Sequence, residues 1–235
     1  MTAQEIVTKL EPLGTEGYRR ILRNHGVSDP MMGVKIEELK KIEKAVKKDY
    51  QLSLELFDTG IYDIMYLAGL IADETKMTKD DLRGWLAKAT CASRAEYAVA
   101  WVAADTPHGW DLGLEWIDSQ EEKAVVVGWA TLSSWVSVTD DADLDIPALR
   151  RLLERIQTTI HQQPNAVRSK MNGFVISLGC YVPELMEESI RAAEEIGKVK
   201  VDVGNTSCKI PFAPDYIRKV HAMGRTGRKR KTARC

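Results

Sequence analysis

Apolar residues recur every three or four positions along most of the chain, and polar residues fill the positions between them. In residues 35–48, for example, Ile36, Leu39, Ile42 and Val46 repeat with the period of an α-helix. This spacing gathers apolar side chains on one face and predicts amphipathic helices. The other face of this segment is basic, which favours either a solvated surface or one that follows phosphates. Its lysines are Lys40, Lys41, Lys44, Lys47 and Lys48.

The middle of the chain, residues 80–136, repeats one helical unit around tryptophan. Four of the six tryptophans follow each other at intervals of 16, 15 and 13 residues: Trp85, Trp101, Trp116 and Trp129. A helix of about three turns with a tight connection needs that many residues, so the spacing predicts a stack of short antiparallel helices. Residues 121–136 are apolar nearly all round, which predicts an interior helix. The four indole rings are expected in the core.

Helix starts in this region are marked by side chains that satisfy free backbone N–H groups. Three pairs fit the capping box, in which a hydroxyl and a carboxylate three residues later cap each other's backbone. These pairs are Thr78 with Asp81, Ser93 with Glu96, and Ser119 with Glu122. Thr106 and Pro107 predict a fourth start, with proline at the first helical position. The intervals between these starts agree with the tryptophan spacing. Asp145 is expected to cap the next helix.

Only one segment of the sequence has a pattern typical of a β-strand. Residues 198–204 alternate like a strand, but no second candidate exists to pair with them, so an extended connector is expected. We therefore predict an all-α fold, a HEAT-like helical-repeat solenoid (an α-α superhelix), with residues 1–223 as a single domain. Residues 224–235 form a basic C-terminal arm, which Gly224 and Gly227 are expected to keep flexible.

The composition is that of an ordinary soluble protein, and a cytoplasmic location is expected. Neither an apolar run of about 18 residues nor a signal peptide is present in the sequence. The four cysteines form no close pair, which argues against a zinc ribbon or a CxxC redox motif, and Cys91 and Cys180 are expected to be buried thiols. The acidic residues 139–143 lack the glycine and terminal glutamate of a calcium loop. We expect no metal and no cofactor.

Charge is distributed unevenly along the chain. The formal net charge is −1, but the arm carries +6, which leaves −7 on residues 1–223. A basic arm on a mildly acidic body indicates a polyanionic partner. The cations of the arm are Arg225, Arg228, Lys229, Arg230, Lys231 and Arg234. Further cations stand at a predicted helix start, Arg168 and Lys170, and around the extended connector, Lys198, Lys200 and Lys209. These residues are candidates for binding nucleic acid phosphates.

Three local stretches carry a resemblance to a known family. Residues 33–41, residues 115–119 and residues 168–175 resemble the DNA alkylation repair family, typified by bacterial alkylpurine DNA glycosylases built from HEAT-like repeats. The resemblance covers most of residues 20–220. The basic arm is not part of the typical glycosylase pattern and looks like that of a divergent branch.

The resemblance implies a curved solenoid that holds duplex DNA and, in active members, excises N3- or N7-alkylated purines. It implies a carboxylate that stabilises the developing oxocarbenium ion, for which Glu96 and Asp105 are the candidates. Glu96 is also explained as the capping partner of Ser93. The family's arginine falls near Lys123, and its later tryptophan is matched by Phe174, which also fits an apolar core stripe.

These observations predict a DNA-binding protein of the alkylation repair family. A more specific form of this prediction is an N-glycosylase that releases alkylated purines. Two alternatives stay open. A non-catalytic helical-repeat scaffold would bind a protein partner through an apolar or acidic inner face. An RNA-binding protein would use the same arm, with aromatic rings stacking on bases.

Overall fold

The computed structural model describes residues 1–28, 30–89, 95–204 and 206–234. Helices account for its regular structure, and these residues contain no strand, which confirms the all-α prediction. Contacts divide the chain into two compact units. Unit 1 holds residues 1–108 with 204, 206 and 234, and unit 2 holds residues 109–203 and 207–233. The prediction of one domain over residues 1–223 stays a prediction. Among the described residues, no helix is long and apolar enough to cross a membrane.

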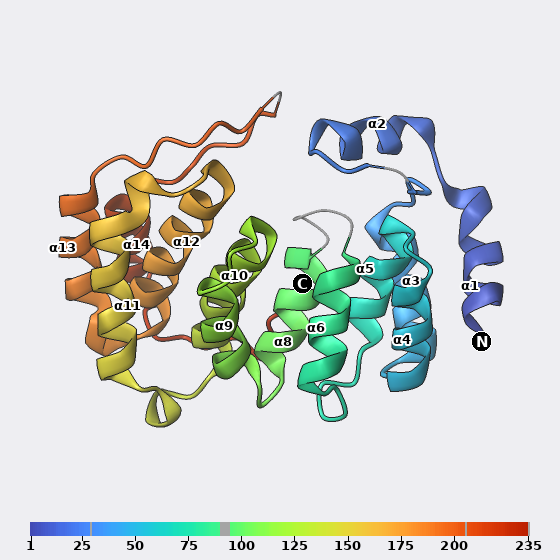
Figure 1. Cartoon of the computed structure of the whole chain (residues 1–235), viewed down its shortest axis with the longest axis horizontal. Helices are drawn as coiled ribbons and strands as arrows, with labels where there is room; N and C mark the ends of the chain where they lie inside the picture. Colours follow the sequence, from blue (N-terminus) through green and yellow to red (C-terminus); the bar gives the residue numbers. More distant parts are fainter. Residues whose placement is uncertain (29, 90–94, 205, 235) are drawn as a thin grey trace. The chain divides into compact units, whose positions relative to one another are not determined.

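Unit 1 is built around α5, whose ten residues are all buried (Figure 1). Neighbouring helices α3 and α4 and the π-helical segment η2 pack on it. On the α4 side, the rings of Phe57 and Trp85 stack with centroids 4.2 Å apart. The helices of this unit are α1 (Ala3–Leu10), α2 (Glu16–Asn24), α3 (Ile36–Val46), α4 (Tyr50–Asp58), α5 (Tyr62–Ile71), α6 (Lys79–Lys88), η2 (Ala95–Ala100) and α8 (Trp101–Asp105). A short 3₁₀ turn, η1 (Glu11–Leu13), follows α1.

Unit 2 is built around α10, which packs between α9 and α12. Two glycines allow α9 and α10 to approach closely: a Cβ on Gly128 would lie 2.6 Å from the backbone nitrogen of Ile117, and one on Gly113 would lie 2.6 Å from Leu132. The helices are α9 (Gly109–Ile117), α10 (Glu122–Val138), α11 (Ile146–Thr159), α12 (Asn165–Tyr181), α13 (Met186–Ile196) and α14 (Ala213–Ala222). Short 3₁₀ turns η3 (Asp141–Asp143), η4 (Ile160–Gln162) and η5 (Pro183–Leu185) connect them. The interior helix predicted over residues 121–136 is confirmed.

Most predicted tryptophan positions are confirmed as core. Trp85, Trp116 and Trp129 are 2%, 3% and 1% exposed. Trp101 is only half-buried, because its ring stands at the edge of unit 1 and supports two tyrosines, Tyr66 and Tyr97.

The predicted helix starts are confirmed in part. The capping box of Thr78 and Asp81 is present, and the Asp145 carboxylate accepts from the N–H of Ala148. Two starts were placed too early in the sequence. Ser119 accepts from the N–H of Glu121, and Thr106 from that of His108, so each hydroxyl closes a turn before its helix begins. The Ser93 box lies outside the described residues.

The C-terminal arm differs from the flexible segment expected, because backbone and side-chain contacts fix it. In unit 2, the N–H of Gly227 donates to the carbonyl of Cys180, and that of Arg230 to the carbonyl of Ser137. The ammonium of Lys229 donates to the carbonyl of Val136 and pairs with Asp141. Gly227 has a φ of 74°, a conformation that glycine adopts without strain.

Candidate nucleic-acid interface

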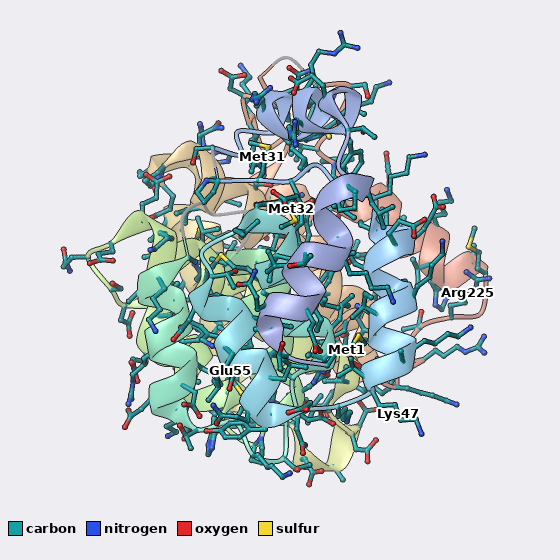
Figure 2. All side chains as sticks on the ribbon, turned by 90° about the vertical axis from the view of Figure 1, so that its right-hand side faces the viewer. Met1, Met31, Met32, Lys47, Glu55 and Arg225 are labelled. Atoms are coloured by element: carbon teal, nitrogen blue, oxygen red, sulfur yellow. The ribbon has the colours of Figure 1, made fainter. Side chains whose placement is uncertain are left out.

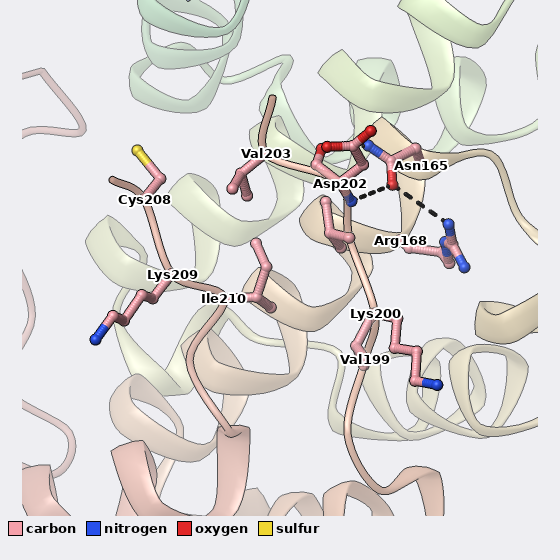
Figure 3. A pocket seen from close by; sticks show the side chains of 10 residues that line it. Asn165, Arg168, Val199, Lys200, Asp202, Val203, Cys208, Lys209 and Ile210 are labelled. Carbon is pink, nitrogen blue, oxygen red and sulfur yellow. Dashed lines mark hydrogen bonds between the residues drawn. The ribbon is translucent and has the colours of Figure 1, made fainter. Parts of the chain in front are cut away.

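An extended connector, described for residues 198–204 and 206–212, links α13 to α14 in place of a helix. Gly197, with a φ of 71°, ends α13 and redirects the chain. The side-chain amide of Asn165, at the start of α12, fixes the connector by two hydrogen bonds with its backbone. Its Nδ2 donates to the carbonyl of Asp202 at 2.7 Å, and its Oδ1 accepts from the Asp202 N–H at 2.8 Å. This pair replaces the strand partner that the alternating sequence lacks (Figure 3).

An open groove of about 520 Å³ lies between α12 and the two limbs of the connector. We call it the basic groove, because three cations line it: Arg168 from α12, Lys200 from the first limb and Lys209 from the second. Figure 3 shows their side chains around the cavity, with Val199, Val203 and Ile210 forming apolar wall between them. The groove therefore combines point charges with an apolar floor.

The guanidinium of Arg168 keeps part of its hydrogen-bonding capacity. One terminal nitrogen donates to the Asn165 side chain at 3.3 Å, so the residue that anchors the connector also orients this arginine. Its Nε is buried, and no acceptor reaches it among the described residues. A buried donor without an acceptor is costly and is uncommon outside functional sites.

The other candidate cations are not gathered in this groove. Lys198 is exposed beside its mouth, Lys170 is half-buried on α12, and Lys123 is half-buried on α10. Within the arm, Arg225, Arg228 and Lys231 are exposed, whereas Lys229 and Arg230 are half-buried. Phe174 is fully buried inside unit 2, where the centroid of its ring lies 5.3 Å from that of Trp129. The ring thus occupies the core position that its apolar stripe also allowed, and it presents no open face to a base.

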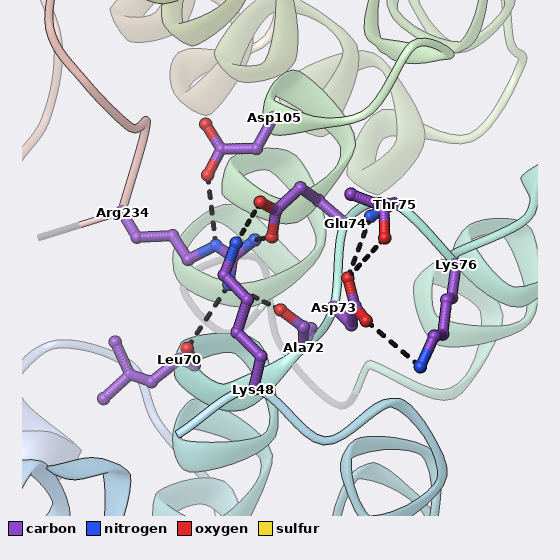
Figure 4. A network of polar contacts seen from close by, with 9 residues as sticks. All are labelled: Lys48, Leu70, Ala72, Asp73, Glu74, Thr75, Lys76, Asp105 and Arg234. Atoms are coloured by element: carbon purple, nitrogen blue, oxygen red, sulfur yellow. Dashed lines mark hydrogen bonds and ion pairs between the residues drawn. The ribbon is translucent and has the colours of Figure 1, made fainter.

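The two carboxylate candidates lie in unit 1. Glu96 is half-buried in η2. Asp105, at the end of α8, pairs with Arg234, and both side chains are only 9% exposed. Figure 4 shows the guanidinium of Arg234 within a set of four acceptors. It donates to Asp105 at 3.1 Å and to Glu74 at 2.6 Å, and one nitrogen reaches the carbonyls of Leu70 at 3.3 Å and Ala72 at 2.7 Å.

Glu74 shows the electrostatics of this network. Burial by itself would raise the pKa of Glu74, but the hydrogen bond from Lys48 and the charge of Arg234 outweigh it, so the pKa lies below its ordinary value. The network therefore favours the ionised form of Glu74.

Sequence reasoning missed two of these features. The partners of Arg234 are separated from it by between 129 and 164 residues, and nothing local marks such a pair. Asn165 has a residue type that suits an anchor of loop backbone, but nothing in the local sequence indicates that it contacts Asp202. The cations of the groove were identified individually, but their convergence depends on how the connector folds back.

The described residues thus define an all-helical repeat protein in which one unit carries a groove lined by cations. Comparison with known proteins places it more narrowly. Residues 6–200 match the family described as DNA alkylation repair enzyme, and the chain belongs to that family. It is 32% identical to Lin0241 of Listeria innocua and 31% identical to Lmo0209 of Listeria monocytogenes, over 93% of this chain and 97% of each relative.

A solved structure agrees over the full length of both chains. It superposes with a TM-score of 0.91 at 31% identity and covers 100% of each chain. That protein represents a new family related to the HEAT-like repeat DNA glycosylases, with affinity for branched DNA structures. The predicted HEAT-like fold and the predicted family are therefore confirmed.

Proposed function

We propose that this protein binds DNA, with branched DNA as its preferred form, and that the basic groove of unit 2 holds the phosphate backbone. The observation that carries the proposal is that Arg168, Lys200 and Lys209, from three separate segments, line one groove. Cations in a groove neutralise phosphates without reading the base sequence. Such contacts suit recognition of DNA by its shape, and the related solved protein has affinity for branched DNA.

The geometry of the connector supports this role. Two hydrogen bonds between the Asn165 side chain and the Asp202 backbone fix the limb that carries Lys200. This limb therefore loses little conformational entropy when it binds DNA. The exposed Lys198 extends the positive charge beyond the groove. The arm cations Arg225, Arg228 and Lys231 are a second, separate set of candidates for phosphate contacts.

The proposal is a binding function and does not include base excision. A carboxylate that stabilises an oxocarbenium ion must face the sugar, whereas Asp105 is directed at Arg234 and almost fully covered. We expect no release of 3-methyladenine or 7-methylguanine from methylated DNA by the purified protein. Release that Glu96→Gln abolishes would instead establish Glu96 as catalytic and the protein as a glycosylase.

The binding test compares a three-way junction, a four-way junction and a linear duplex of equal length by fluorescence anisotropy over a series of salt concentrations. We expect tighter binding to the junctions and a linear fall of log K with log salt. The double variant Lys200→Gln/Lys209→Gln should reduce the magnitude of that slope by about 2, because each lost phosphate contact removes about 0.9.

The matched control is Arg151→Gln/Lys219→Gln, which removes two exposed cations of unit 2 outside the groove. It should leave the slope within error of the unaltered protein. No junction binding at low salt, or equal losses in both double variants, would contradict the proposal. Competition with structured RNA tests the RNA-binding alternative. That alternative is favoured if RNA displaces the labelled junction at a lower concentration than unlabelled junction DNA does.

A further inference from the structure

Unit 1 contains a pocket to which the proposed function assigns no role. It has a volume of about 390 Å³ and lies between α2, the start of α3, α5 and η2. We call it the tyrosine pocket, because Tyr18, Tyr62, Tyr66 and Tyr97 all line it. Its volume falls in the range of about 300–1,000 Å³ that is usual for small-molecule sites. The lining is mostly apolar, with His25 as a polar group in the wall.

Apolar side chains are exposed at this pocket more than elsewhere. Of the seven large apolar side chains that are exposed among the described residues, three line it: Ile21, Ile36 and Tyr97, at 50%, 41% and 38%. Scattered apolar residues on a surface need no explanation, but a concave cluster usually marks a contact site. The exposure is therefore concentrated where a ligand would be enclosed.

Hydrogen bonds preorganise the floor of the pocket. The carboxylate of Asp63, 2% exposed, accepts from the N–H groups of Met32, Gly33 and Val34 at 2.7, 3.2 and 2.8 Å. Figure 2 shows the loop with Met31 and Met32 beneath α2. On the other side, Nε of Arg19 donates to the carbonyl of Met32 at 3.0 Å, which ties α2 to the same loop. A site held this way loses little entropy when it is filled.

The aromatic wall is supported from behind. The centroid of the Trp101 ring lies 5.2 Å from that of Tyr97 and 6.2 Å from that of Tyr66, so the most exposed tyrosine of the pocket rests on a second aromatic ring. A braced and partly exposed aromatic ring is what a stacking platform for bases requires. This also gives the half-buried Trp101 a role that the fully buried tryptophans do not have.

One exposed cation, Lys35, lies next to the pocket lining, and α2 carries further cations on its remaining surface. Helix α2 carries Arg19, Arg20 and Arg23 against one acid, Glu16, which pairs with the first and third. Arg20 is exposed on this helix, and Lys35 is exposed between two lining residues. The acids at the start of α3 are Glu37 and Glu38, and Lys41 pairs with the second. Aromatic rings with cations beside them match the two parts of a nucleotide, its base and its phosphate.

We propose that the tyrosine pocket receives one unstacked nucleobase from the branch point of a DNA junction. This inference rests on the proposed function, since it names the part of branched DNA that unit 1 recognises. Base pairing and stacking are interrupted where helices meet, so an unpaired base enters at a lower cost than one taken from an intact duplex. The base stacks on Tyr97, and Lys35 contacts a flanking phosphate.

The test uses a three-way junction with two unpaired thymines at its branch point, in parallel with the fully paired junction. The unaltered protein should prefer the unpaired junction by about 5- to 150-fold, which corresponds to the contribution of about 1–3 kcal/mol per base from stacking on an aromatic ring. Tyr97→Leu and Ile21→Glu should each remove that preference, so that each variant binds the two junctions with equal affinity. Ile21 is half-exposed, so its variant tests the pocket with little effect on folding.

A second readout locates the base directly. With 5-iodouracil in place of one unpaired thymine, irradiation should cross-link it to a peptide that contains Tyr97 or Tyr66. The matched control is Tyr216→Leu, a tyrosine of unit 2 that is 45% exposed and lies outside the pocket. It should keep both the preference and the cross-link.

Two failures can be told apart. If junctions bind through the basic groove but Tyr97→Leu keeps the preference, or the cross-link maps only to unit 2, the pocket proposal is wrong and the DNA-binding function stands. If no junction binds, both are wrong. A DNA-free dimer in sedimentation that Ile21→Glu dissociates would assign the pocket to a second copy of the chain and also overturn the inference.

Discussion

Replacing Arg234 by methionine tests whether the penultimate residue stabilises unit 1. The guanidinium donates to two carboxylates and two backbone carbonyls, and its side chain is 9% exposed. Removal leaves Asp105, equally covered, without this cation. Breaking a buried pair from one side costs about 3–5 kcal/mol. Glu74 keeps its contact with Lys48, which lowers the expected cost to about 3 kcal/mol.

The assay is urea unfolding followed by tryptophan fluorescence, in which Trp85 and Trp101 report on unit 1. A loss of about 3 kcal/mol lowers the midpoint by about 1–3 M, since the dependence on urea is about 1–3 kcal/mol per M. The control is Arg228→Met, an exposed arginine of the same arm, which should change stability by less than about 0.5 kcal/mol. Indistinguishable midpoints for the two variants would refute the reasoning.

Four further outcomes follow from the contacts above. Stability should fall as the pH drops from the unfolded pKa of Glu74 through its lowered folded pKa, because the stabilisation by this carboxylate is complete above the unfolded pKa and is lost on protonation. Arg234→Met should flatten this acid limb in pH-dependent unfolding. Gly128→Ala should cost about 1–3 kcal/mol because its Cβ would overlap α9, whereas Gly173→Ala, with open space, should gain about 0.5–1 kcal/mol in the same unfolding assay. Burial raises the pKa of Cys180 to about 11, so peptide mapping after iodoacetamide at pH 7.5 should find this thiol modified only in denatured protein. Asp63→Asn should cost about 2–4 kcal/mol in urea unfolding, since one amide oxygen cannot accept from three N–H groups and the amide nitrogen opposes one of them.

The helices could be read from the sequence because each one carries its own periodic signal. Residues 121–136 appeared as an interior helix because apolar residues surround it, and α10 is that helix. Boundaries were less exact where two local motifs compete. Ser119 followed by Glu122 has the capping-box spacing, but the serine closes a turn with Glu121 instead. A hydroxyl can satisfy either N–H, and the sequence does not specify which.

The candidate sites depended on contacts that no local pattern encodes. Asp63 is a single acid within the apolar helix α5, and its carboxylate organises a loop about 30 residues away in sequence. The groove cations were recognised by residue type, yet their convergence follows from the hold of Asn165 on Asp202. The sequence therefore predicted which residue types would matter. It did not predict which of them would meet.

The arm shows why charge counted along a sequence overstates charge available to a ligand. Six cations lie between residues 225 and 234, but Lys229 is paired with Asp141 and Arg234 with Asp105 and Glu74. The exposed cations of this segment are Arg225, Arg228 and Lys231. Replacing these three by glutamine should lower the salt dependence of DNA binding by at most about 3, whereas six available cations would allow about 5. Deleting the whole arm is a poorer experiment, because it removes Arg234 and weakens unit 1 at the same time. A further decrease when Lys229→Gln is added to the triple variant would contradict this count, because it would mean that the pair of Lys229 with Asp141 opens when DNA binds.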